Sequence, residues 1–145
     1  MARSGLIYSI ATRLGEPGLG KVSYHAALAL IEAGCLNKAV CYGNKTDLPS
    51  DKVLALLGNP AKLLFFLPRP VYRPLRKAYF DFVTARAIEI IGCTAFHGWN
   101  SQSLRSAQAA KRKGARVIIE CGSTHTLYRK DLLVDEYRRF GAKRP

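Results

Sequence analysis

Acidic residues are scarce in this sequence. Its 145 residues include 10 Asp and Glu against 23 Lys and Arg, which gives a formal net charge of +13 at pH 7. A charge of this size favours anionic partners through long-range attraction. Nucleic acid, an anionic lipid surface and phosphorylated small molecules all fit that description, so the chemistry of the site has to separate them.

Long apolar runs are also lacking. The longest, such as residues 26–31 and 63–68, fall far short of the roughly 20 residues that a membrane-spanning helix needs. The amino terminus shows neither the apolar core nor the cleavage site of a secretion signal. We therefore expect one soluble, cytoplasmic domain, with peripheral attachment to a membrane as an alternative.

Cysteine pairs with metal-ligand spacing are absent. The four cysteines form no C-x-x-C motif, and three of them lie in or beside apolar segments that we predict to be buried strands. They are Cys35, Cys41, Cys93 and Cys121. We expect reduced core thiols, and we expect neither a metal nor another cofactor.

Short apolar runs alternate with longer segments of helical period, a pattern typical of βαβ units. It predicts a Rossmann-like, doubly wound α/β fold with a mainly parallel sheet of about five strands and helices on both faces. The predicted strands are 6–11, 38–42, 63–67, 94–97 and 116–120, and the predicted helices are 22–32, 52–57, 75–91, 101–113 and 127–140. Prolines 68, 70 and 74 should delay the third helix until about Leu75.

Ligands of such folds collect outside the carboxyl ends of the strands, where helix N-termini point outward. Three loops with unusual residues follow predicted strands: 15–21, 98–100 and 122–125. Because the strands are parallel, these loops should meet along one edge of the sheet.

The glycine-rich loop 15–21 admits several interpretations, of which a plain tight turn is the simplest. Gly20-Lys21 almost completes a P-loop, but Val22 stands where that motif needs a Ser or Thr hydroxyl, so an NTPase is not favoured. A dinucleotide-binding motif is not favoured either, because Ser23 replaces its third glycine.

Three segments together resemble family-4 (group 1) glycosyltransferases. Residues 18–24, Gly-Leu-Gly-Lys-Val-Ser-Tyr, resemble the glycine loop and first helix of that family, and residues 96–100, Phe-His-Gly-Trp-Asn, resemble the end of its fourth strand. Residues 120–125 and 132–137 are similar to its fifth strand and the helix that follows. The likeness covers nearly the whole chain.

The resemblance implies the GT-B arrangement, in which two Rossmann-like domains face each other across a cleft. Such enzymes transfer a sugar from a nucleotide-sugar to an acceptor without a metal, and the first domain mainly holds the acceptor. Residues 1–145 would then be an incomplete amino-terminal, acceptor-side domain. Its partners would be the nucleotide-sugar, the acceptor and a donor-binding carboxyl-terminal domain, without which we expect the fragment to be inactive.

The resemblance also assigns roles to individual residues. His97 is the catalytic candidate, although a lone histidine at a strand end is often structural. The substrate-binding candidates are Gly18, Gly20, Lys21, Trp99, Asn100 and His125. Gly18 and Gly20 would approach the donor diphosphate, and helix capping is the alternative explanation for the polar residues around His125.

The stretch 69–86 mixes basic and aromatic residues. An ordinary amphipathic helix with a solvated face explains it, while contact with a lipid or a phosphorylated acceptor, or with nucleic acid, remains an alternative. The competing function for the whole chain is therefore a basic α/β module that binds nucleic acid or another polyanion.

Overall fold

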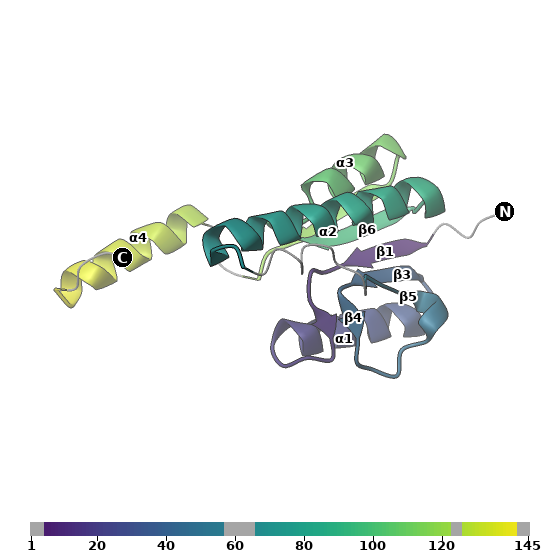
Figure 1. Cartoon of the computed structure of the whole chain (residues 1–145), viewed down its shortest axis with the longest axis horizontal. Coiled ribbons are helices and arrows are strands. Elements are labelled where there is room, and N and C mark those ends of the chain that lie inside the picture. Colours follow the sequence, from purple (N-terminus) through teal and green to yellow (C-terminus); the bar gives the residue numbers. More distant parts are fainter. Residues whose placement is uncertain (1–4, 57–65, 123–125, 142–145) are drawn as a thin grey trace.

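Five strands form one parallel sheet in the computed structural model, which describes residues 5–56, 66–122 and 126–141 (Figure 1). Their order across the sheet is β5-β3-β1-β6-β7. The strands are β1 (Leu6–Ser9), β3 (Leu36–Cys41), β5 (Val53–Ala55), β6 (Ala95–Trp99) and β7 (Arg116–Glu120). Two short strands, β2 (Arg13–Leu14) and β4 (Gly43–Asn44), pair separately. The predicted Rossmann-like α/β class is confirmed.

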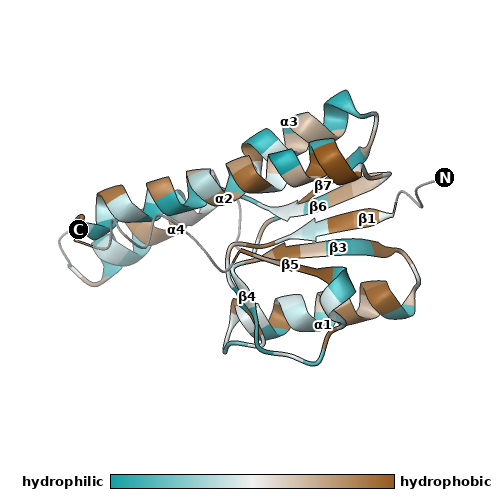
Figure 2. Cartoon of the chain, turned by 45° about the vertical axis from the view of Figure 1, so that its right-hand side comes forward, coloured by the Kyte–Doolittle hydropathy of each residue, from teal (hydrophilic) through white to brown (hydrophobic). Residues whose placement is uncertain are grey.

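Helices cover both faces of the sheet. Helix α1 (Leu19–Glu32) lies on one face, and α2 (Arg69–Ile91) and α3 (Leu104–Arg112) lie together on the other (Figures 1 and 2). Helix α4 (Thr126–Arg139) lies beyond the carboxyl ends of the strands in both views. The strands run toward that side, so their carboxyl ends face away from the amino terminus.

The alternation of side chains along each strand divides the core in two. Ile7 and Phe96 pack with Phe80 and Ile88 of α2. Tyr8 packs on the opposite face of the sheet, in the cluster that contains Ala27 of α1. Because helices bury both faces, Ile7, Tyr8 and Ser9 of β1 are inaccessible to solvent, as expected for the central strand of a parallel sheet.

The predicted helix at 52–57 is wrong. A 3₁₀ turn occupies Ser50–Lys52, and Val53–Ala55 forms β5, which pairs with residues 39–41 of β3. The β-branched Val53 suits a strand, and the open edge of β3 supplies backbone partners that periodicity does not reveal. The third strand was predicted at 63–67, but residues 66 and 67 form a turn and a bend, and 63–65 lie outside the described residues.

Helix α2 begins at Arg69, well before the expected Leu75. Pro70 stands in the first turn, where a missing N–H costs no intrahelical hydrogen bond, and Pro74 is accommodated within the helix. The other shared elements begin or end within a few residues of their predicted limits.

The cysteine prediction holds only in part. Cys41 and Cys93 are buried, but Cys35 and Cys121 are exposed. Cys35 follows the glycine that ends α1, and Cys121 follows the last residue of β7, so both lie just outside the buried strands.

Candidate functional site

The order of the strands reverses between β1 and β6. From β1 the chain adds β3 and β5 on one side, then crosses over through α2 and adds β6 and β7 on the other side. In open α/β sheets the crevice at such a switch point is the usual ligand site. The loops that follow β1 and β6 meet there, because the Ala11 amide donates a hydrogen bond to Oε1 of Gln102 at 2.9 Å.

The loop after β6 is strained at this crevice. Ser101 has a φ of 63°, and it is the non-glycine residue with a positive φ in the described part of the chain. This conformation is costly for an L-residue and is found preferentially at functional sites. The Ser101 hydroxyl accepts a hydrogen bond from Nζ of Lys77 at 3.0 Å, which links the loop to α2.

The amino-terminal half of α2 contributes basic side chains to the same edge. The Tyr42 hydroxyl, just past β3, donates to the backbone oxygen of Arg76 at 2.8 Å. The Arg76 guanidinium carbon lies 4.1 Å from the centroid of the Tyr42 ring, a cation–π contact. Burial raises the pKa of Tyr42, although the nearby Arg76 charge opposes this shift.

Tyr42 and Arg76 border two pockets of about 280 Å³ each. The first also contains Arg13 and Glu16, and the second also contains Ala11, Arg73 and Lys77. Glu16 Oε1 lies 3.0 Å from Nζ of Lys45 and 3.4 Å from Nη1 of Arg13, and hydrogen bonding to Lys45 lowers the pKa of Glu16. A carboxylate therefore neutralises the first pocket, whereas only cations and neutral groups line the second.

The glycine loop lies at the carboxyl edge, where it leads into α1. Gly18 is the N-cap with a φ of 79°, and no side chain caps the helix. Gly20 has a packing reason to be glycine, because a Cβ there would clash with the carbonyl oxygen of Arg13. The exposed side chain of Lys21 follows in the first turn. The turn interpretation thus explains Gly20, and the amino end of α1 keeps its N–H groups without a side-chain cap.

His97 lies inside β6 on the sheet face that it shares with Tyr8. Its Nε2 is 3.2 Å from Oε2 of Glu120 at the end of β7, and its ring meets the Tyr8 ring edge-on at a centroid distance of 5.1 Å. The His97 side chain is 20% exposed. A carboxylate that fixes one ring nitrogen leaves the other able to exchange a proton, which is the arrangement of an oriented general base.

Trp99 and Asn100 differ in their surroundings. Trp99 is buried, and its indole N–H donates to the Tyr8 hydroxyl at 3.0 Å. Burial is the main reason why the pKa of Tyr8 is raised. Asn100 is exposed, and its side-chain amide donates to Sγ of Cys121 at 3.1 Å. His125 lies outside the described residues.

The structure thus brings the glycine loop, Asn100 and the basic half of α2 to the carboxyl edge, with His97 set back on the sheet face. Sequence reasoning singled out the basic stretch but not the subset that faces the crevice, Arg73, Arg76 and Lys77. Their spacing of three and four residues was a usable signal for one helix face. The contact between His97 and Glu120 joins β6 and β7, so no pattern of nearby residues in the sequence indicates it.

Comparison with models of protein families, with curated proteins and with solved structures found no match. Within residues 5–56, 66–122 and 126–141, no helix is long and apolar enough to cross a membrane. The same residues contain no group of three or more His, Cys, Asp or Glu side chains arranged to hold a metal ion.

Proposed function

We propose that this chain is the acceptor-side domain of a glycosyltransferase that moves a sugar from a nucleotide-sugar to an acceptor. The observation that carries the proposal is the reversal of strand order between β1 and β6, with the glycine loop and a basic pocket on the same carboxyl edge. The resemblance of residues 18–24 and 96–100 to family-4 glycosyltransferases adds the type of reaction.

The chemistry of sugar transfer suits the groups at this edge. The leaving diphosphate accumulates negative charge, which backbone N–H groups and cations stabilise. In this proposal the uncapped amino terminus of α1, with Gly18 and Lys21, faces that charge. Glu120 lies 3.2 Å from Nε2 of His97, so in this proposal Nδ1 is the nitrogen that takes the proton from the acceptor hydroxyl.

The test is the turnover of a His97→Ala variant in a protein that joins this chain to a nucleotide-sugar-binding domain. Loss of a general base should lower turnover by about 10²–10⁴-fold. His25→Ala is the matched control, because His25 is exposed on α1, and it should leave turnover unchanged. Equal rates for His97→Ala and the unmodified protein, with both correctly folded, would remove His97 from the proposed site.

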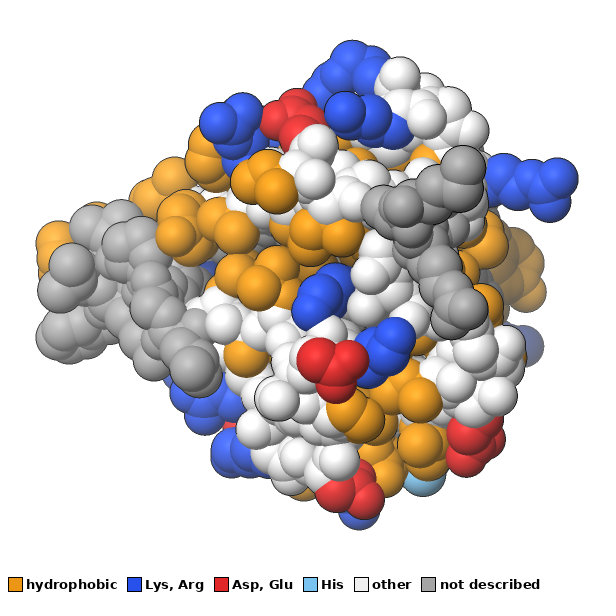
Figure 3. Space-filling view, turned by 90° about the vertical axis from the view of Figure 1, so that its right-hand side faces the viewer, with side chains coloured by type: hydrophobic (Ala, Val, Ile, Leu, Met, Phe, Trp, Pro, Cys, Tyr) orange, Lys and Arg blue, Asp and Glu red, His pale blue; other side chains and the backbone are white. Residues whose placement is uncertain are grey.

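A polyanion-binding module is the second candidate, and the net charge of +13 is the observation that favours it. Seen from the amino-terminal side, however, basic, acidic and apolar side chains are interspersed (Figure 3). Salt-sensitive binding of this chain to RNA or DNA would favour this candidate over sugar transfer, if the protein joined to a nucleotide-sugar-binding domain also releases no nucleoside diphosphate from nucleotide-sugars.

A further inference from the structure

We infer that the pocket lined by Ala11, Tyr42, Arg73, Arg76 and Lys77 binds a phosphate group of a small anionic ligand. That the ligand is the acceptor rests on the proposed function, whereas phosphate binding rests on the pocket alone. The pocket is at the switch point, between the loop after β1 and the amino-terminal half of α2.

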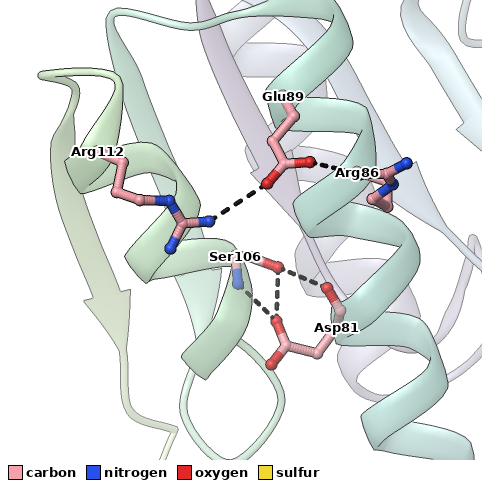
Figure 4. Close-up of polar contacts among 5 residues, drawn as sticks. All are labelled: Asp81, Arg86, Glu89, Ser106 and Arg112. Atoms are coloured by element: carbon pink, nitrogen blue, oxygen red, sulfur yellow. Dashed lines mark hydrogen bonds and ion pairs between the residues drawn. The ribbon is translucent and has the colours of Figure 1, made fainter.

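Within the part of the chain that the structure describes, the cations of this pocket have no ionic partner. No carboxylate of the described residues lies within ion-pair distance of Arg73, Arg76 or Lys77. The carboxyl-terminal half of α2 behaves differently, because Glu89 there binds Arg86 at 3.0 Å and Arg112 of α3 at 3.3 Å (Figure 4). Glu89 thus offsets the charge of the carboxyl-terminal half of α2, whereas no described carboxylate pairs with the cations of the half at the crevice.

The amino-terminal half of α2 contains no acidic residue that could neutralise these cations. Residues 69–80 include Arg69, Arg73, Arg76 and Lys77, and no Asp or Glu. A bound anion would therefore offset a charge that this half of the helix leaves uncompensated.

Two of the cations are held in position before any ligand arrives. The Tyr42 ring supports the Arg76 guanidinium, and Ser101 holds the Lys77 ammonium. Arginine can donate two parallel N–H groups to two oxygens of one phosphate. The volume of about 280 Å³ is roughly nine times the share of one water in the liquid, so a phosphate and part of its ester fit.

The neighbouring pockets are less suitable for an anion. Glu16 lies in the pocket on the Arg13 side. On the other side a pocket of about 490 Å³, which Arg73 and Lys77 also line, contains Asp81. The Asp81 carboxylate accepts the Ser106 amide at the start of α3 (Figure 4). Each neighbouring pocket thus contains a carboxylate and the pocket between them contains none, so we infer that the anion binds there.

The direct test is calorimetric titration of the full chain with pyrophosphate and with inorganic phosphate. We expect saturable binding that the double variant Arg73→Gln/Lys77→Gln weakens by at least about tenfold, because each lost charged hydrogen bond is worth that order. Both side chains are exposed, so the variant should fold. The matched control, Lys111→Gln/Lys113→Gln, removes the same charge from exposed positions at the end of α3 and should change affinity less than about twofold.

Absence of saturable binding, or an equal loss in both double variants, would overturn the inference, since the latter would mean that only net charge matters. Binding is then measured with soluble glycerol 3-phosphate and with vesicles of phosphatidylglycerol in phosphatidylcholine. The comparison shows whether the ligand is a free phosphate ester or a lipid headgroup. Binding of either, if weakened by Arg73→Gln/Lys77→Gln, supports the pocket. Phosphate binding by this chain, with no sugar transfer by the protein that joins it to a nucleotide-sugar-binding domain, would support the pocket and remove the proposed function.

Discussion

At the scale of single residues, Asp81 shows how one carboxylate joins two helices. It is buried on α2, accepts the backbone N–H groups of Arg105 and Ser106 at 2.7 and 2.9 Å, and accepts the Ser106 hydroxyl at 2.6 Å. It therefore caps α3 from outside that helix, with a charge that suits the amino-terminal dipole. The side chain is a structural element of the fold, although it borders a pocket.

Replacing Asp81 by Ala should lower the free energy of unfolding by about 2–3 kcal/mol, because the amides of Arg105 and Ser106 lose their charged acceptor. Urea unfolding followed by circular dichroism measures this. Asp135→Ala is the control, since Asp135 is exposed on α4 and should change stability by less than about 0.5 kcal/mol. Comparable losses for the two variants would contradict the capping role.

The buried thiol of Cys41 should make the free energy of unfolding fall at alkaline pH. Burial raises the pKa of its thiol from 9.0 to about 11. The unfolded thiol loses its proton near pH 9, whereas the folded thiol keeps it until about pH 11. The stability that depends on Cys41 is therefore complete below pH 9 and falls by about 1.4 kcal/mol per pH unit between these values.

Unfolding free energies from pH 7 to pH 11 test this expectation. Cys41→Ala should have a shallower decline above pH 9, and Cys35→Ser, an exposed site, should keep the original slope. Some decline should persist in Cys41→Ala, because burial also raises the pKa of Cys93 and of Tyr8. An unchanged slope in Cys41→Ala would show that its thiol is accessible to solvent.

At the scale of elements, two glycines of the loop before α1 are required for different reasons, Gly20 for close packing and Gly18 for its backbone conformation. A methyl group at Gly20 would clash with the backbone oxygen of Arg13, whereas a methyl group at Gly18 would meet open space but an unfavourable φ of 79°. We expect Gly20→Ala to lose more than about 2 kcal/mol of stability and Gly18→Ala about 1–2 kcal/mol. Thermal and urea unfolding rank the two variants, and a larger loss for Gly18→Ala would contradict the geometry of the loop.

Most elements were predictable because their signals are local. Apolar runs such as Leu6–Ser9 and Ala95–Trp99 form strands, and Gly34 and Gly114 end helices with positive φ, as expected. Strand β5 was not predictable, because its three residues form a strand only by pairing with β3. The early start of α2 was missed because proline disfavours helix interiors but not the first turn.

The candidate site was predictable only in outline. Topology alone indicates the carboxyl edge, and the sequence identifies the glycine loop and the basic stretch. The pairing of His97 with Glu120, and the burial of Trp99 against Tyr8, depend on which strands are neighbours and which face each side chain takes. Those facts follow from long-range register, which a single sequence does not display.

At the scale of the whole molecule, the two halves of α2 differ in whether their cations form ion pairs. The carboxyl-terminal half of α2 uses Glu89 to neutralise Arg86 and Arg112, and the amino-terminal half leaves Arg73, Arg76 and Lys77 unpaired among the described residues. The unpaired cations adjoin the switch point of the sheet. Fold topology and electrostatics therefore indicate the same ligand-binding edge of the sheet.

An amide NMR titration of the ¹⁵N-labelled chain with pyrophosphate tests that claim most directly. We expect saturable shifts concentrated at Ala11, Thr12, Tyr42, Lys77 and Ser101, with little change at the amino ends of the strands. Shifts scattered over the whole surface, or centred away from the switch point between β1 and β6, would contradict it.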